Sequence, residues 1–116
     1  MQNSLNNNGK MTAAQLQDLL MGGAWVMVGE YRQFSPETTQ ARDKKTGQVR
    51  YFKVLRSTIE TGKDSVPVTE FVSEETDMSK VAAPASKGDK VVVVFARANT
   101  DKGQRSVSGQ VYQLVK

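Results

Sequence analysis

The chain has 116 residues, a formal net charge of +4 and 38% hydrophobic residues, which is enough for one modest core. It contains neither cysteine nor histidine, so a disulfide framework, a zinc–thiolate site and a cysteine nucleophile are excluded. The absence of histidine also removes the commonest general base and the commonest metal ligand. We therefore expect a binding protein of a reducing, cytoplasmic compartment, with no cofactor and no metal, rather than an enzyme.

The first residues of the chain are polar and show neither the charged nor the apolar region of a secretory signal. We expect residues 1–10 to form a disordered tail and residues 11–116 to form a single domain. No apolar run approaches the roughly 20 residues that a membrane-spanning helix requires, so no membrane is expected among the partners.

The first regular element is predicted by a capping box. Thr12 stands at the N-cap position and Gln15 three residues later, so that each side chain can bond the backbone amide of the other. Leucines follow at helical spacing, and Gly22 with Gly23 supplies a C-terminal cap. These signals predict a helix over residues 12–21 that covers an end or an edge of a sheet. A partner-binding helix is the alternative.

A strand and a hairpin follow the helix. Residues 24–32 predict a first strand, and Gly29 in its interior indicates a bend or a bulge, which suits a sheet that curls into a barrel. Residues 38–61 predict a hairpin around the turn at residues 43–47, where Gly47 is free to take a positive φ.

The third strand of this meander is predicted over residues 65–72, after a turn at residues 61–64. Pro67 has no amide proton to donate, which places the strand at a sheet edge or at a bulge. The acidic residues 73–80 are expected to form one or two helical turns, with Ser73 as the cap. This segment lacks the ligand spacing of a calcium site; it could instead lie over a basic face of the domain.

The clearest strand signal lies near the C-terminus. Residues 90–97 include four consecutive valines, which indicate burial on both faces or a central position. Residues 99–103 are expected to form a loop and residues 105–115 the last strand. This order predicts a mainly β fold, namely a five-stranded Greek-key barrel of the OB type with a short N-terminal helix. An SH3-like barrel is the nearest alternative.

Alternation along the return arm of the hairpin does not decide which side chains face the core. The two sets of alternate residues in 49–56 each mix apolar and cationic side chains. We expect Phe52 and Val54 to point inward, and Tyr51 and Lys53 outward. We assign Trp25 and Phe95 to the core. Tyr31 and Phe34 suit either the core or a binding surface.

Positive charge is concentrated in two blocks that are far apart in the sequence. Residues 32–56 carry seven basic and two acidic side chains, and residues 90–116 carry five basic and one acidic. The intervening residues 57–89 carry three basic and seven acidic side chains. If the two basic blocks meet in the fold, they form a face that attracts a polyanion.

Three stretches of the chain resemble, in their order, the single-stranded DNA-binding proteins of filamentous phages and their OB-fold relatives. Residues 32–52 hold a basic hairpin before the aromatic Tyr-Phe strand, residues 88–94 a glycine turn into the valine strand, and residues 103–116 a Gly-Gln loop before the closing strand. The resemblance spans residues 24–116. It implies an OB barrel, usually a dimer, that coats single strands without strong sequence preference in a bacterial or phage-infected cell. The N-terminal helix and the acidic connection depart from the family and leave its dimer mode open.

A protein that binds single strands needs cations along the phosphates and flat π-faces for unstacked bases. The hairpin supplies both, and in an OB barrel the last loop flanks the same face. Single-stranded DNA or RNA is therefore the expected partner. A small β-barrel assembly protein that binds a protein partner is the main alternative, and an enzyme based on carboxylates is the second. The predicted nucleic-acid-binding residues are Arg42, Lys44, Lys45, Arg50, Tyr51, Lys53, Arg56, Arg97, Lys102, Arg105 and Tyr112.

Overall fold

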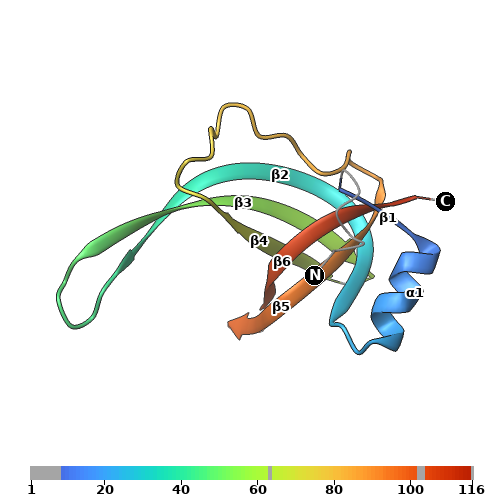
Figure 1. Ribbon diagram of the computed structural model, residues 1–116. Coiled ribbons are helices and arrows are strands. Elements are labelled where there is room, and N and C mark those ends of the chain that lie inside the picture. Colours follow the sequence, from blue (N-terminus) through green and yellow to red (C-terminus); the bar gives the residue numbers. More distant parts are fainter. Residues whose placement is uncertain (1–8, 63, 102–103, 116) are drawn as a thin grey trace.

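Figure 1 shows the computed structural model, which describes residues 9–62, 64–101 and 104–115. Most of the expected tail, residues 1–8, lies outside the described residues, whereas Lys10 at its end belongs to a short strand. No helix in the described parts of the chain is long and apolar enough to cross a membrane. The elements are, in chain order, β1 (Lys10–Thr12), α1 (Ala13–Met21), β2 (Val26–Arg42), β3 (Val49–Thr61), β4 (Asp64–Val72), β5 (Lys90–Asp101) and β6 (Gln104–Val115).

Five strands form a ring in the order β6-β4-β3-β2-β5, which closes because β5 also pairs with β6. Every pair in the ring is antiparallel except β4 with β6, which are parallel and meet at two positions. The short strand β1 extends the sheet by pairing with β6. This strand order confirms the predicted five-stranded Greek-key barrel of the OB type with one short N-terminal helix.

The barrel closes because β2 bends sharply near its start. Its first residues, 26–30, pair with β5, and the strand then continues along β3 with a shift of register between Tyr31 and Gln33. At the bend the backbones are so close that a Cβ on Gly29 would lie 2.6 Å from the carbonyl oxygen of Glu60. Only glycine fits such an approach, and the bend predicted at this position is confirmed.

The helix α1 begins and ends as the sequence predicts. The Gln15 amide donates to Thr12 Oγ1 at 3.2 Å, and the Thr12 amide donates to Gln15 Oε1 at 2.9 Å. This is the expected capping box. The helix ends at Gly22, and the following Gly23 has a φ of +80°, which a residue with a side chain rarely adopts.

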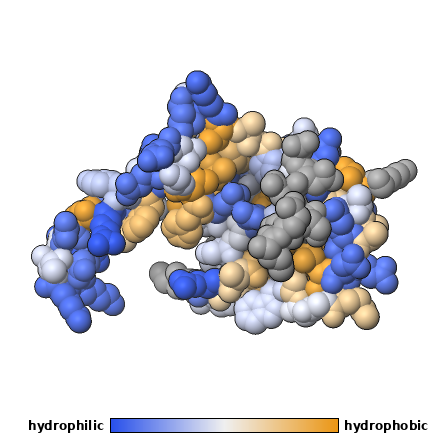
Figure 2. Space-filling model, in the orientation of Figure 1, coloured by the Kyte–Doolittle hydropathy of each residue, from blue (hydrophilic) through white to orange (hydrophobic). Residues whose placement is uncertain are grey.

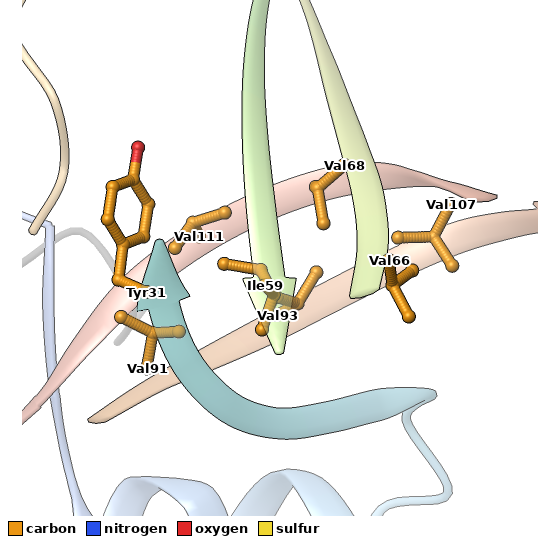
Figure 3. Close-up of a cluster of buried hydrophobic side chains, with 8 residues drawn as sticks. All are labelled: Tyr31, Ile59, Val66, Val68, Val91, Val93, Val107 and Val111. Carbon is orange, nitrogen blue, oxygen red and sulfur yellow. The ribbon is translucent and has the colours of Figure 1, made fainter. Parts of the chain in front are cut away.

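Val91, Val92 and Val93 of β5 are fully buried and Val94 is partly buried, so both faces of the strand are covered, as predicted. Val91 and Val93 point into the barrel, where they join the main core drawn in Figure 3. Val92 and Val94 point outward into a second cluster that the leucines of α1 cover. Each such side chain contributes about 1.5–3 kcal/mol when it leaves water. The main core consists of Tyr31, Ile59, Val66, Val68, Val91, Val93, Val107 and Val111.

Three local predictions are wrong. Residues 73–80 form two hydrogen-bonded turns, from Thr76 N to the Ser73 carbonyl and from Lys80 N to the Asp77 carbonyl, rather than helical turns. The first strand is also longer than expected, because β2 runs without a break to the hairpin turn. Finally, Pro67 marks neither an edge strand nor a bulge, since β4 lies between β3 and β6 and pairs with β3 without a shift of register. It is tolerated because it lies just before the short contact with β6, which begins at the next residue.

The hairpin between β2 and β3 extends well beyond the barrel. β4 stops pairing with β3 at Lys53, so residues 39–52 form a ribbon of two strands that pair only with each other among the described residues. We call this ribbon the arm; it curves away from the barrel at the left of Figure 1. Its turn is closed by Gly47, whose φ is +74° as predicted, and by Asp43, whose side chain accepts two backbone amides.

Candidate functional site

A groove lies between the arm and the hairpin formed by β5 and β6, over the outer face of β3 and β4. Side chains that point into the barrel from these strands, such as Ile59 and Val68, alternate with side chains that point into the groove. Figure 2 shows the hollow under the arm, with apolar surface at its inner end. The groove is lined by Thr39, Gln40, Ala41, Phe52, Arg56, Thr69, Phe71, Asn99, Ser106, Val107 and Ser108.

Two phenylalanines form the apolar part of the groove. Phe52 is 37% exposed and Phe71 is 60% exposed. Their ring centroids are 6.1 Å apart at an interplanar angle of 84°, an edge-to-face arrangement. Val54 shares their side of the sheet, directly opposite Phe71, and is fully buried. Exposed aromatic rings on a strand are unusual because burying them would stabilise the fold, so their exposure indicates a binding surface.

The prediction for the return arm is therefore partly wrong. Val54 is buried, as expected, and Phe52 shares its face. However, that face is the groove and not the barrel interior, which takes the alternate residues Ser57 and Ile59. Ser57 is buried because its hydroxyl lies 2.9 Å from the Tyr31 hydroxyl in the core. Burial raises the pKa of the Tyr31 phenol, so this pair stays uncharged.

Three of the predicted arginines surround the two rings. Arg56 lines the groove and is 3.7 Å from Glu37, an exposed pair that contributes little. Arg50 lies directly opposite Ala41, and Arg97 directly opposite Ser108, both of which line the groove. Side chains of paired residues share one side of a sheet, so Arg50 and Arg97 border the groove from its two walls. Both are exposed, and neither makes an ion pair with a described residue.

The turn of the arm presents the next group of cations. Asp43 accepts the amides of Lys45 and Thr46 at 2.8 and 3.3 Å, so its carboxylate is used within the turn. Arg42 donates to the Gly47 carbonyl at 3.4 Å and remains exposed. The side chains of Lys44 and Lys45 are exposed at the end of the arm. The arm therefore carries positive charge out along one side of the groove.

Tyr51 and Lys53 do not belong to the groove. Tyr51 is 63% exposed as predicted, but alternation places it on the other face of the arm from Phe52. Lys53 points away from the groove as well, and its Nζ donates to the carbonyls of Glu74 and Thr76 at 2.7 and 2.8 Å. Lys53 thus holds the connecting segment on the face opposite the groove, so its predicted contact with phosphate has no support from the groove geometry.

Of the residues predicted on and near the last strand, Tyr112 is contradicted by its burial, whereas the roles of Arg105 and Lys102 stay predictions. Arg105 is 2.9 Å from Asp64 and donates to Thr61 at 3.2 Å, so it is paired at the turn between β3 and β4. Tyr112 is 7% exposed and lies in the cluster under α1, where burial raises the pKa of its phenol and its hydroxyl donates to Gln110. A buried ring offers no face for stacking. Lys102 lies outside the described residues.

Sequence reasoning missed Phe71 and misplaced Trp25. The valines at positions 66 and 68 fix the inward set of β4, and the opposite set then contains Phe71, so alternation held the signal. Trp25 is 61% exposed instead of buried, because it precedes the first residue of β2 and rests against Phe95, with ring centroids 6.1 Å apart. Phe95 packs against the main core, as expected.

No protein-family model matches the chain, and no curated protein matches it significantly. Among solved structures, the chain is similar to the solution NMR structure of the OB domain of Ta0387 from Thermoplasma acidophilum, with a TM-score of 0.43 and 13% sequence identity. The similarity covers 89% of this chain and 84% of that chain. The order of the strands in the ring makes the chain an OB-type barrel, and no narrower family is assigned.

Proposed function

We propose that the protein binds single-stranded nucleic acid, with single-stranded DNA as the expected form, in the groove beneath the arm. The observation that carries this proposal is the exposed pair of Phe52 and Phe71 with arginines on both sides of it. Rings in this setting accept unstacked bases, and the arginines accept the phosphates that follow them. A duplex keeps its bases stacked and cannot use the rings.

The rest of the groove supports binding without strong sequence preference. Its polar lining consists mainly of hydroxyl and amide groups, from residues such as Thr69, Asn99 and Ser106. A hydroxyl both donates and accepts, so it suits the edge of any base. Stacking is similarly tolerant because every base has a π-face. The arm would lie along the strand, with its turn supplying phosphate contacts at one end.

The charge arrangement gives a salt dependence. Apart from Arg42, which already donates to the Gly47 carbonyl, five exposed cations border the groove or end the arm. Each one that neutralises a phosphate adds about 0.7 to the magnitude of the logarithmic salt slope on a single strand. We therefore expect a slope of about −3.5 for the association constant. The five are Lys44, Lys45, Arg50, Arg56 and Arg97.

The test is a fluorescence anisotropy titration of a labelled oligo-dT of about 16 nucleotides, the upper end of the site size of one OB fold. The same titration with duplex DNA of matched length, each at several salt concentrations, measures strand selectivity. We expect tighter binding of the single strand and a steep salt dependence. A flat salt response, or no binding at about 50 μM protein in low salt, where non-specific binding is normally detectable, would overturn the proposal.

A protein-assembly role is the second candidate, and one observation favours it. Four large apolar side chains are exposed near the junction of α1 and β2, at the opposite end of the barrel from the arm: Leu20, Met21, Trp25 and Val28. A homodimer, as the resemblance implies, could use them. Sedimentation velocity without oligonucleotide separates the two functions, because an assembly protein associates in the absence of nucleic acid.

A further inference from the structure

A second cavity opens between β4 and β6, on the opposite side of β3 and β4 from the groove. The two strands meet only at Val68 and Thr69 of β4, and beyond these positions they separate. The cavity between them has a volume of about 440 Å3, which is within the range of small-molecule sites. Ala82 and Pro84 of the connecting segment also line it. Because Leu55, Ser57, Val68 and Glu70 alternate with the groove residues, the cavity is separate from the groove.

The cavity combines an apolar floor with a few polar groups. Phe34, Leu55, Val68 and Val111 supply the apolar surface. Of the polar groups, the Ser57 hydroxyl is already bonded to Tyr31, and the Tyr112 hydroxyl to Gln110 at 2.5 Å. The remaining polar side chains that line the cavity are the amide of Gln110, whose oxygen accepts from Tyr112, and the carboxylate of Glu70.

Glu70 is half-buried and has no partner of opposite charge. It makes no hydrogen bond or ion pair with any described residue, and burial alone raises its pKa. Lys53 shares this face of β3, but its ammonium group is held by the carbonyls of Glu74 and Thr76. Removing a carboxylate from water costs free energy unless a cation or a hydrogen-bond donor compensates for it. The cavity therefore holds a carboxylate without a compensating cation next to an apolar surface, which favours a cationic ligand with an apolar part.

We infer that this cavity binds an organic cation, in which an alkylguanidinium or alkylammonium group pairs with Glu70 and its alkyl stem contacts Phe34, Leu55 and Val68. A guanidinium ion fits best because its planar pair of N–H donors matches a carboxylate. Two sources share this chemistry. One is a free polyamine or guanidino compound, and the other is a lysine or arginine side chain of a bound polypeptide.

The first experiment titrates the protein with butylguanidinium and with its neutral isostere butylurea, while the methyl resonances of Leu55, Val68 and Val111 are followed by NMR. We expect saturable shifts with butylguanidinium and about tenfold weaker binding of butylurea, since only the cation forms a charge-assisted pair. Equal shifts with both compounds, or no saturable shift with either, would overturn the inference without any variant being needed.

The second experiment repeats the titration on Glu70→Gln, which keeps the shape of the side chain but removes its charge. Butylguanidinium should bind about tenfold more weakly, and Glu75→Gln, an exposed carboxylate outside the cavity, should bind it like the original protein. Unchanged affinity in Glu70→Gln would contradict the inference. Agmatine and a capped glycine peptide with one central arginine then distinguish the sources: whichever binds more tightly identifies the class of natural ligand.

Discussion

The two outer faces of the barrel differ in what covers them. On β5, the outward side chains Val92 and Val94 lie beneath α1, so their apolar surface stabilises the fold. On β3 and β4, the outward side chains Phe52 and Phe71 have no helix over them and are flanked by arginines. The same alternation thus produces a covered face and an open face. The difference shows that exposed apolar residues on the open face are available for a ligand.

The largest expected effect is a loss of stability when a buried side chain is removed from the covered face. Met11 is completely buried in the cluster under α1, so Met11→Ala leaves a cavity there and should lower the free energy of unfolding by about 2–5 kcal/mol. Urea denaturation measures this loss. The fraction that stays folded should bind oligo-dT with its original affinity, and a loss of affinity in that fraction would show that the two faces are not independent.

The next effect lies on the open face. Phe71→Ala should weaken binding of oligo-dT by about 1–3 kcal/mol, the usual contribution of a stacked base, and change stability much less. Trp25→Ala is the matched control, because Trp25 is equally exposed and does not line the groove. Anisotropy titrations measure both variants. Similar losses in the two variants would argue against a site centred on Phe71.

Charge on the open face can be tested through the salt slope. Arg97→Gln should reduce the magnitude of the slope by about 0.7, because one phosphate contact is lost. Arg105→Gln should leave the slope unchanged, since Arg105 is paired with Asp64 outside the groove. The measurement is the affinity for oligo-dT at several salt concentrations. Equal reductions in both variants would mean that the field of the whole protein, rather than the groove, controls binding.

The smallest effect concerns Glu70, which faces neither the groove nor α1. Glu70→Gln should raise the free energy of unfolding at neutral pH by about 0.5–1 kcal/mol, below the full cost of a completely buried unpaired polar group. Because folding raises the pKa of this carboxyl, its stabilising contribution is present in acid and is lost as the pH rises through the folded-state pKa. The gain in the free energy of unfolding should therefore disappear in acid. Denaturation at neutral and at acidic pH measures it. A gain of equal size in acid would contradict this account.

Features that depend on neighbouring residues in the sequence were predicted well. The capping box of Thr12, the bend at Gly29 and the turn glycine Gly47 each have a local cause, and the strand order agrees with the predicted barrel. The candidate site was predicted less completely. The arm and its cations were found, but the partners of Lys53 and Arg105 come from distant segments, and no local pattern indicates them.

Burial of aromatic residues was the other weak point. Tyr112 was predicted to be exposed and Trp25 to be buried, and the reverse is true. The position of α1 decides the first, because its leucines pack in the same cluster as Tyr112, whereas Trp25 precedes the first residue of β2 and lies outside that cluster. A helix that packs on the outside of a sheet reverses the burial that alternation alone would predict for the strands beneath it.

The contact between Lys53 and the connecting segment has a mechanical consequence. Lys53 is the first residue of β3 that pairs with β4, so it marks the point where the arm leaves the barrel. The Nζ atom of the same side chain donates hydrogen bonds to the carbonyls of Glu74 and Thr76. Movement of the arm at its base would therefore displace residues 74–76 as well, because the two hydrogen bonds couple them.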